Sequence, residues 1–88
     1  MIEFEEYKVK LNGLRPTLDS LKDALHLEAA EKEIEELEGQ SARDGFWRDV
    51  ANSQRVQKRL KQLKSKTENY QKLCAQWDDL MTLCEMAL

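Results

Sequence analysis

Apolar residues recur at alternating steps of three and four along most of this 88-residue chain, and this periodicity constrains its fold most strongly. Heptad spacing of this kind places the apolar side chains on one stripe of an α-helix. The first stripe is formed by Phe4, Tyr7, Leu11, Leu14, Leu18, Leu21 and Leu25. It predicts a helix over about 2–25. The helix is expected to continue through Pro16 with a bend near Gly13, because the buried apolar side chains outweigh the roughly 3 kcal/mol that an interior proline costs.

The phase of the apolar pattern changes at His26, where we expect a break or tight corner between two helices. The second stripe is formed by Leu27, Ala30, Ile34 and Leu37. It predicts a helix over about 27–38 that ends near Gly39, because glycine is the usual residue just beyond a helix C-terminus.

A third and longer stripe follows a polar loop. Its members again alternate in steps of four and three, and they are Val56, Leu60, Leu63, Thr67, Tyr70, Cys74, Trp77, Met81, Cys84 and Leu88. They predict a helix over about 50–87. Asp49 precedes this helix and is a suitable N-cap, because its carboxylate can accept hydrogen bonds from amides of the first turn.

The fold class predicted from these stripes is all-α, as one domain over residues 1–88. The first two helices together are about as long as the third, which favours an elongated antiparallel helical hairpin or three-helix bundle with coiled-coil-like packing. Charge supports this pairing, because residues 27–39 carry a net charge of −5 and residues 40–72 a net charge of +6. One proline and three glycines are too few for a turn-rich sheet protein.

Two adjacent aromatic residues, Phe46 and Trp47, lie in the polar loop "SARDGFWRDV". One interpretation is a plug, in which both rings cover the end of the hairpin core and contribute several kcal/mol through burial. The other is an exposed anchor for a partner protein. We prefer the plug at this point.

The stretch "RVQKRLKQLKSK" is the second candidate surface. Its cations Arg55, Lys58, Arg59, Lys61 and Lys64 spread around all of the helix except the apolar stripe. They are interpreted as a solvated belt that pairs with the acidic helix, and contact with RNA phosphates or an acidic protein is the alternative. The run holds no aromatic residue that could stack on bases, and the sequence pI is about 5.2, so we expect no autonomous nucleic-acid binding.

Enzyme and membrane functions find no support in the sequence. There is no glycine-rich phosphate loop, no cysteine pair at metal-binding spacing, and one histidine without a metalloprotease motif, so we expect no catalysis, metal or cofactor. No apolar run is long enough to span a membrane, and the acidic start does not resemble a signal peptide. Cys74 and Cys84 would lie about 15 Å apart on one helix, which is too far for a disulfide. A reducing, cytoplasmic location is therefore expected.

The order of an acidic helix, a Phe-Trp pair and a basic helix resembles a known family. Residues 27–73, "LEAAEKEIEELEGQSARDGFWRDVANSQRVQKRLKQLKSKTENYQKL", are similar to the N-terminal helical region of bacterial class I peptide chain release factors. Complete members also carry a Ser-Pro-Phe-type tripeptide that reads the stop codon and a Gly-Gly-Gln motif that triggers peptide release. Neither motif occurs in this chain, so the resemblance implies a fragment of a longer protein.

The resemblance implies a non-catalytic role in translation termination. In that family the first domain extends toward the stalk base of the large ribosomal subunit and toward the GTPase that recycles the factor, so the ribosome and this GTPase are the expected partners. A monomer is expected. One alternative is a self-contained coiled-coil scaffold or adaptor, which would form oligomers through its stripes. Another is the helical tRNA-binding arm of a synthetase-like enzyme.

Overall fold

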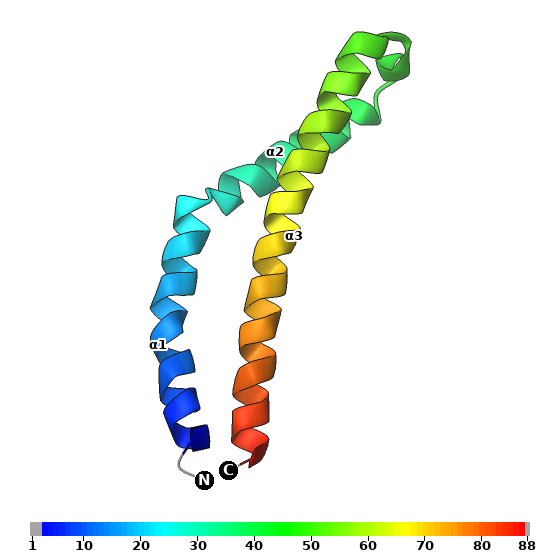
Figure 1. Ribbon diagram of the computed structural model, residues 1–88. Helices are drawn as coiled ribbons and strands as arrows, with labels where there is room; N and C mark the ends of the chain where they lie inside the picture. The colour runs from blue at the N-terminus through cyan, green and yellow to red at the C-terminus, as the bar shows by residue number, and fades with distance from the viewer. Residues whose placement is uncertain (1–2, 88) are drawn as a thin grey trace. The chain divides into compact units, whose positions relative to one another are not determined.

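The computed structural model describes residues 3–87 (Figure 1). This part of the chain contains the α-helices α1 (Glu3–Ala24), α2 (Leu27–Ser41) and α3 (Val50–Ala87), with a short 3-10 helix, η1 (Phe46–Arg48), before α3. No strand occurs among these residues. The predicted all-α fold is confirmed.

The helices form two compact units, and α3 contributes to both. The first unit consists of α1 up to Leu25 together with α3 from Asn69 onward, and the second unit is His26–Glu68. Each unit has its own packing and is described separately. The single domain over residues 1–88 stays a prediction.

In the second unit, α2 packs on the N-terminal half of α3. The buried core is formed by Ala30, Leu37, Phe46, Val56 and Leu63, with the half-buried Ile34 and Leu60 packed against it. These residues come from the predicted stripes of the two helices and from η1. Val56 lies at the centre and has no exposed surface.

In the first unit, α1 lies antiparallel to the C-terminal half of α3 (Figure 1). The Tyr70 hydroxyl donates to the Leu18 carbonyl over 3.1 Å, and the Trp77 indole N–H donates to the Leu11 carbonyl over 2.6 Å. Both donors are half-buried aromatic residues, so their polar atoms find partners on the α1 backbone. As residue numbers rise along α3 they fall along α1, as the predicted hairpin requires.

The observed helix bounds agree with most of the predicted ones, and the predicted start of the first helix at residue 2 lies outside the described residues. Helix α1 is continuous through Pro16, and the hydrogen bonds from Trp77 and Tyr70 hold its backbone on both sides of the proline. His26 forms the expected corner and adopts a left-handed conformation, with φ of 53°. Helix α3 begins at Val50, and the Asn52 amide donates to the Asp49 carboxylate over 3.0 Å. This contact is the N-cap that the sequence predicts.

The predicted end of α2 at Gly39 is wrong, because the helix continues to Ser41. The Ala42 amide still bonds to the Glu38 carbonyl over 3.2 Å, and the Ser41 hydroxyl bonds to the Leu37 carbonyl. The left-handed glycine that redirects the chain is Gly45, with φ of 82°. Glycine ends a helix only where a left-handed residue is needed, and here that position lies six residues later.

The long stripe on α3 packs as predicted. All its members up to Cys84 are buried or half-buried, and Leu88 lies outside the described residues. The cysteines are free thiols, Cys84 buried and Cys74 half-buried, in line with their interpretation as small apolar residues.

The stripe on α1 is only partly covered. Leu11, Leu18, Leu21 and Leu25 are buried or half-buried, whereas Phe4, Tyr7 and Leu14 are exposed. Within the first unit, α1 packs on a single helix, and one helix covers less than the width of this stripe.

Candidate functional site

The turn that carries Phe46 and Trp47 is built from local backbone interactions. Gly45 supplies the positive φ that other residues adopt only at a cost, and it opens the single turn of η1. The Phe46 amide bonds to the Arg43 carbonyl, and the Arg48 amide bonds to the Gly45 carbonyl, over 3.2 and 3.1 Å. These bonds hold the backbone of the turn from which both side chains extend.

The two aromatic rings of this turn have different surroundings. Phe46 is 8% exposed and belongs to the core of the second unit, whereas Trp47 is 58% exposed. Their centroids lie 5.0 Å apart with an angle of 88° between the ring planes, an edge-to-face contact. The plug interpretation is therefore confirmed for Phe46 and wrong for Trp47.

The difference between the rings follows from the geometry of η1. Consecutive residues of a 3-10 helix lie about 120° apart around its axis, so adjacent side chains cannot both face the same core. Trp47 lies instead on the surface. Its neighbours in the sequence, Arg48 and Val50, are exposed as well. An adjacent aromatic pair in the sequence does not reveal which ring is buried.

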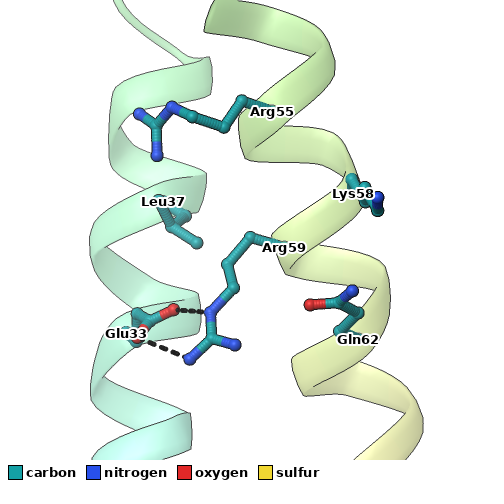
Figure 2. A pocket seen from close by; sticks show the side chains of 6 residues that line it. All are labelled: Glu33, Leu37, Arg55, Lys58, Arg59 and Gln62. Atoms are coloured by element: carbon teal, nitrogen blue, oxygen red, sulfur yellow. Dashed lines mark hydrogen bonds and ion pairs between the residues drawn. The ribbon is translucent and has the colours of Figure 1, made fainter.

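Two cations of the basic belt bind acidic residues of α2. The Arg59 guanidinium makes a two-pronged contact with the Glu33 carboxylate, with Nε–Oε2 of 2.5 Å and Nη2–Oε1 of 3.2 Å (Figure 2). The Lys64 ammonium lies 2.8 Å from a Glu38 carboxylate oxygen. The predicted pairing of the acidic and basic helices is confirmed at these positions.

The Arg59–Glu33 contact shifts the titration of both groups. Hydrogen bonding to the guanidinium holds the pKa of Glu33 below its usual value, and hydrogen bonding to the carboxylate raises the pKa of Arg59. Both side chains remain substantially exposed, so solvent screens the attraction and the pair fixes register more than it adds stability.

The remaining cations do not converge on one point. A groove at α2 and α3 has a volume of about 480 Å³ and is lined by Glu33, Leu37, Arg55, Lys58, Arg59 and Gln62. Figure 2 shows these six side chains. Arg55 extends toward α2 and donates to the Asn52 side chain, whereas Lys58 lies on the side of α3 away from α2. Among the described residues, Lys58 and Lys61 form no ion pair. These cations therefore form a distributed basic surface.

The structure adds residues that the sequence interpretation did not name as part of this surface. In the sequence, Glu33 and Glu38 are two of six glutamates in an acidic run, and the crossing of the two helices decides which of them meets which base. Gln62 and Asn52 had no signal in the sequence, since lone amides on a polar helix face are ordinary.

Over residues 3–87, no group of three His, Cys, Asp or Glu side chains is placed to hold a metal ion. None of the helices in this part combines the length and apolarity that crossing a membrane requires. The second unit presents an exposed tryptophan in η1 and exposed cations along α3.

Curated relatives match almost the whole chain. Peptide chain release factor 2 of Clostridium perfringens is 33% identical over 86 residues, which is 98% of this chain and 24% of the relative. The same factor of Petrotoga mobilis is 28% identical over 87 residues, covering 99% of this chain and 24% of the relative. Peptide chain release factor 2 of Acidothermus cellulolyticus is 36% identical over 77 residues, which is 88% of this chain and 21% of the relative. This chain is similar to one region of peptide chain release factor 2.

The resemblance predicted from the acidic-helix, aromatic-pair and basic-helix order is thereby confirmed. The likeness to release factor 2 takes in both units and the Phe46–Trp47 turn, because it covers nearly the whole chain. The chain spans about a quarter of the length of these relatives. No family model matches the chain, and no solved structure matches it with comparable significance.

Proposed function

We propose that this chain is a non-catalytic part of a peptide chain release factor and acts in translation termination in the cytoplasm. The observation that carries the proposal is the likeness to release factor 2 over 97–99% of the chain in several bacterial relatives. Those relatives are about four times longer, so the reading of stop codons and the release of peptide are assigned to regions outside the matched one.

The proposed role is docking near the ribosomal stalk base or on the GTPase that recycles the factor. Trp47 is suited to such contact, because an exposed tryptophan with a fixed backbone loses little conformational freedom on binding. Lys58, Lys61 and Arg55 would contribute salt-dependent attraction to an acidic protein or to RNA phosphates. Arg59 and Lys64 contribute less in this proposal, since each already holds a glutamate.

The chain is proposed to dock as a monomer with low affinity. Its partners would meet one small surface, whereas a complete factor binds through several domains at once and gains from their effective concentration. The alternative is a self-contained coiled-coil scaffold. The exposed apolar residues of α1 favour it, because such residues support oligomers.

Co-sedimentation of the chain with purified ribosomes tests the docking surface. We expect binding at low ionic strength that weakens as salt rises, and a clear loss for Trp47→Ala and for Lys58→Glu. Lys72→Glu is the matched control for the charge change, because Lys72 is also exposed on α3 but lies in the first unit. Equal binding of all variants, or no binding to ribosomes or to the GTPase at low salt, would overturn the docking role.

A further inference from the structure

The first unit carries an open apolar groove between α1 and α3. One part has a volume of about 440 Å³. It is lined by seven apolar residues and one cation, which are Phe4, Tyr7, Leu11, Leu14, Leu80, Leu83, Cys84 and Lys10. A second part of about 280 Å³ shares Leu11, Leu14 and Leu80 with the first and extends to Leu21 and Leu73. The groove thus follows α1 from Phe4 to Leu21, a length of about 26 Å at 1.5 Å per residue.

Large apolar side chains at the groove remain in contact with water. Tyr7 is 52% exposed and Leu83 is 61% exposed, and Phe4, Leu14 and Leu80 are exposed as well. A contiguous exposed patch of this kind marks an interaction site more often than isolated surface residues do. Its two rows of side chains follow helical spacing on two antiparallel helices, a shape that a third helix can fill.

The charge around the groove is acidic. Residues 3–25 and 69–87 hold eight acidic and five basic residues, a net charge of −3. Three of the five bases have a partner within the unit. Lys8 lies 3.8 Å from Glu85, Arg15 contacts both Asp19 and the ring of Trp77, and the Lys10 ammonium lies 5.9 Å from the centre of the Tyr7 ring.

Acidic residues without an ion pair lie close to the groove. Glu5 and Glu6 line a shallow hollow that shares Lys10 with the groove, and Asp79 directly precedes the groove residue Leu80. No ion pair of Glu5, Glu6 or Asp79 occurs among the described residues. Lys10 is a single cation at the groove, against these three carboxylates, so the charge beside the apolar surface is mostly negative.

We propose that this groove binds a basic amphipathic helix of a partner protein. The apolar stripe of that helix would cover Tyr7, Leu14, Leu80 and Leu83, and its flanking cations would meet Glu6 and Asp79. The surface is distinct from the Trp47 surface of the second unit, so it would serve a second partner or a second contact.

Charge also favours a basic helix over the other ligands that could bind an apolar groove. A second copy of the chain would bring two acidic faces together, and like charges across an interface oppose association. Nucleic acid and an anionic lipid surface carry the same sign of charge as the first unit and are disfavoured for the same reason. A basic amphipathic helix can cover the apolar side chains of the groove and pair with the acidic residues near it.

The test uses two synthetic helical peptides of 18 residues that share one stripe of leucines. In one peptide all the remaining positions are lysine, and in the second they are glutamate. Titration calorimetry measures the binding of each peptide to the 88-residue chain. We expect the lysine peptide to bind at least about tenfold more tightly and to weaken as salt rises.

Two variants of the chain locate the binding site. Leu83→Lys should weaken the lysine peptide about tenfold, because it places a like charge in the groove. Met86→Lys is the matched control, because Met86 is 78% exposed on the same helix and does not line the groove. This variant gains the same charge, and we expect it to weaken binding of the lysine peptide about twofold at most. Tyr7→Lys repeats the test on α1, and circular dichroism verifies the helical fold of each variant.

The proposal is overturned if the two peptides bind equally or if Leu83→Lys and Met86→Lys have the same effect. It is also overturned if sedimentation shows a dimer that Leu83→Lys alone dissociates, since the groove would then be occupied by a second copy. None of these results depends on ribosome binding, which concerns residues of the second unit.

Discussion

At the scale of single residues, Phe46 and Trp47 show that neighbours of the same chemical type can have opposite roles. Phe46 stabilises the second unit from within, and Trp47 lies on its surface. The sequence indicated that the pair is structurally important. It could not indicate which ring is buried, because that depends on the 3-10 turn that Gly45 begins.

Alanine substitution of each ring should therefore have a different cost. Phe46→Ala removes a buried aromatic side chain and is expected to lower the free energy of unfolding by roughly 3–5 kcal/mol. Trp47→Ala removes one edge-to-face contact and is expected to cost about 1 kcal/mol or less. Urea unfolding followed by circular dichroism measures both. Similar losses for the two variants would show that Trp47 is also buried.

The pKa of Glu33 is a second prediction at this scale. Hydrogen bonding to Arg59 lowers the pKa in the folded state, so the stabilisation from this pair is present above the usual glutamate pKa. It is lost as the pH falls through the lowered value. Carboxyl chemical shifts should show the Glu33 midpoint below the usual range. The midpoint should move upward in Arg59→Gln and stay in place in Lys58→Gln, and an unchanged midpoint in Arg59→Gln would refute the assignment.

At the scale of elements, helix bounds were predictable wherever a strong local signal existed. The Asp49 N-cap fixed the start of α3, the phase change fixed the corner at His26, and the apolar stripe carried α1 through Pro16. The end of α2 was not predictable from Gly39 alone. A glycine that could end a helix is indistinguishable in the sequence from one that simply lies within it.

Substitution of the two glycines by alanine distinguishes these roles. Gly39 lies inside α2 with open space at its Cβ position, so Gly39→Ala should stabilise the chain by about 0.5–1 kcal/mol. Gly45 also has open space but adopts φ of 82°, so Gly45→Ala should destabilise it by about 1 kcal/mol. Thermal unfolding of both variants shows whether each substitution raises or lowers the stability of the chain. Destabilisation by Gly39→Ala would contradict the observed extent of α2.

At the scale of the whole molecule, the all-α class and the partners of each helix could be predicted, because heptad stripes specify which faces must be buried. The individual ion pairs, and the part of the α1 stripe that stays exposed, could not be predicted from the sequence. Glu33 and Arg59 meet only because α2 crosses α3 at one particular place. The exposure of Tyr7 and Leu14 follows from the number of helices packed on α1, which the α1 sequence does not encode.

We propose that this chain docks during translation termination and does not itself release peptide. A purified termination reaction tests this proposal, with ribosomes halted at a stop codon, a complete release factor at limiting concentration, and this chain in large excess at low salt. We predict no peptide release by the chain alone and a modest slowing of release by the complete factor, because the two compete for one docking site. Peptide release by the chain alone, or an unchanged rate together with no binding to the ribosome or the recycling GTPase, would refute this proposed role.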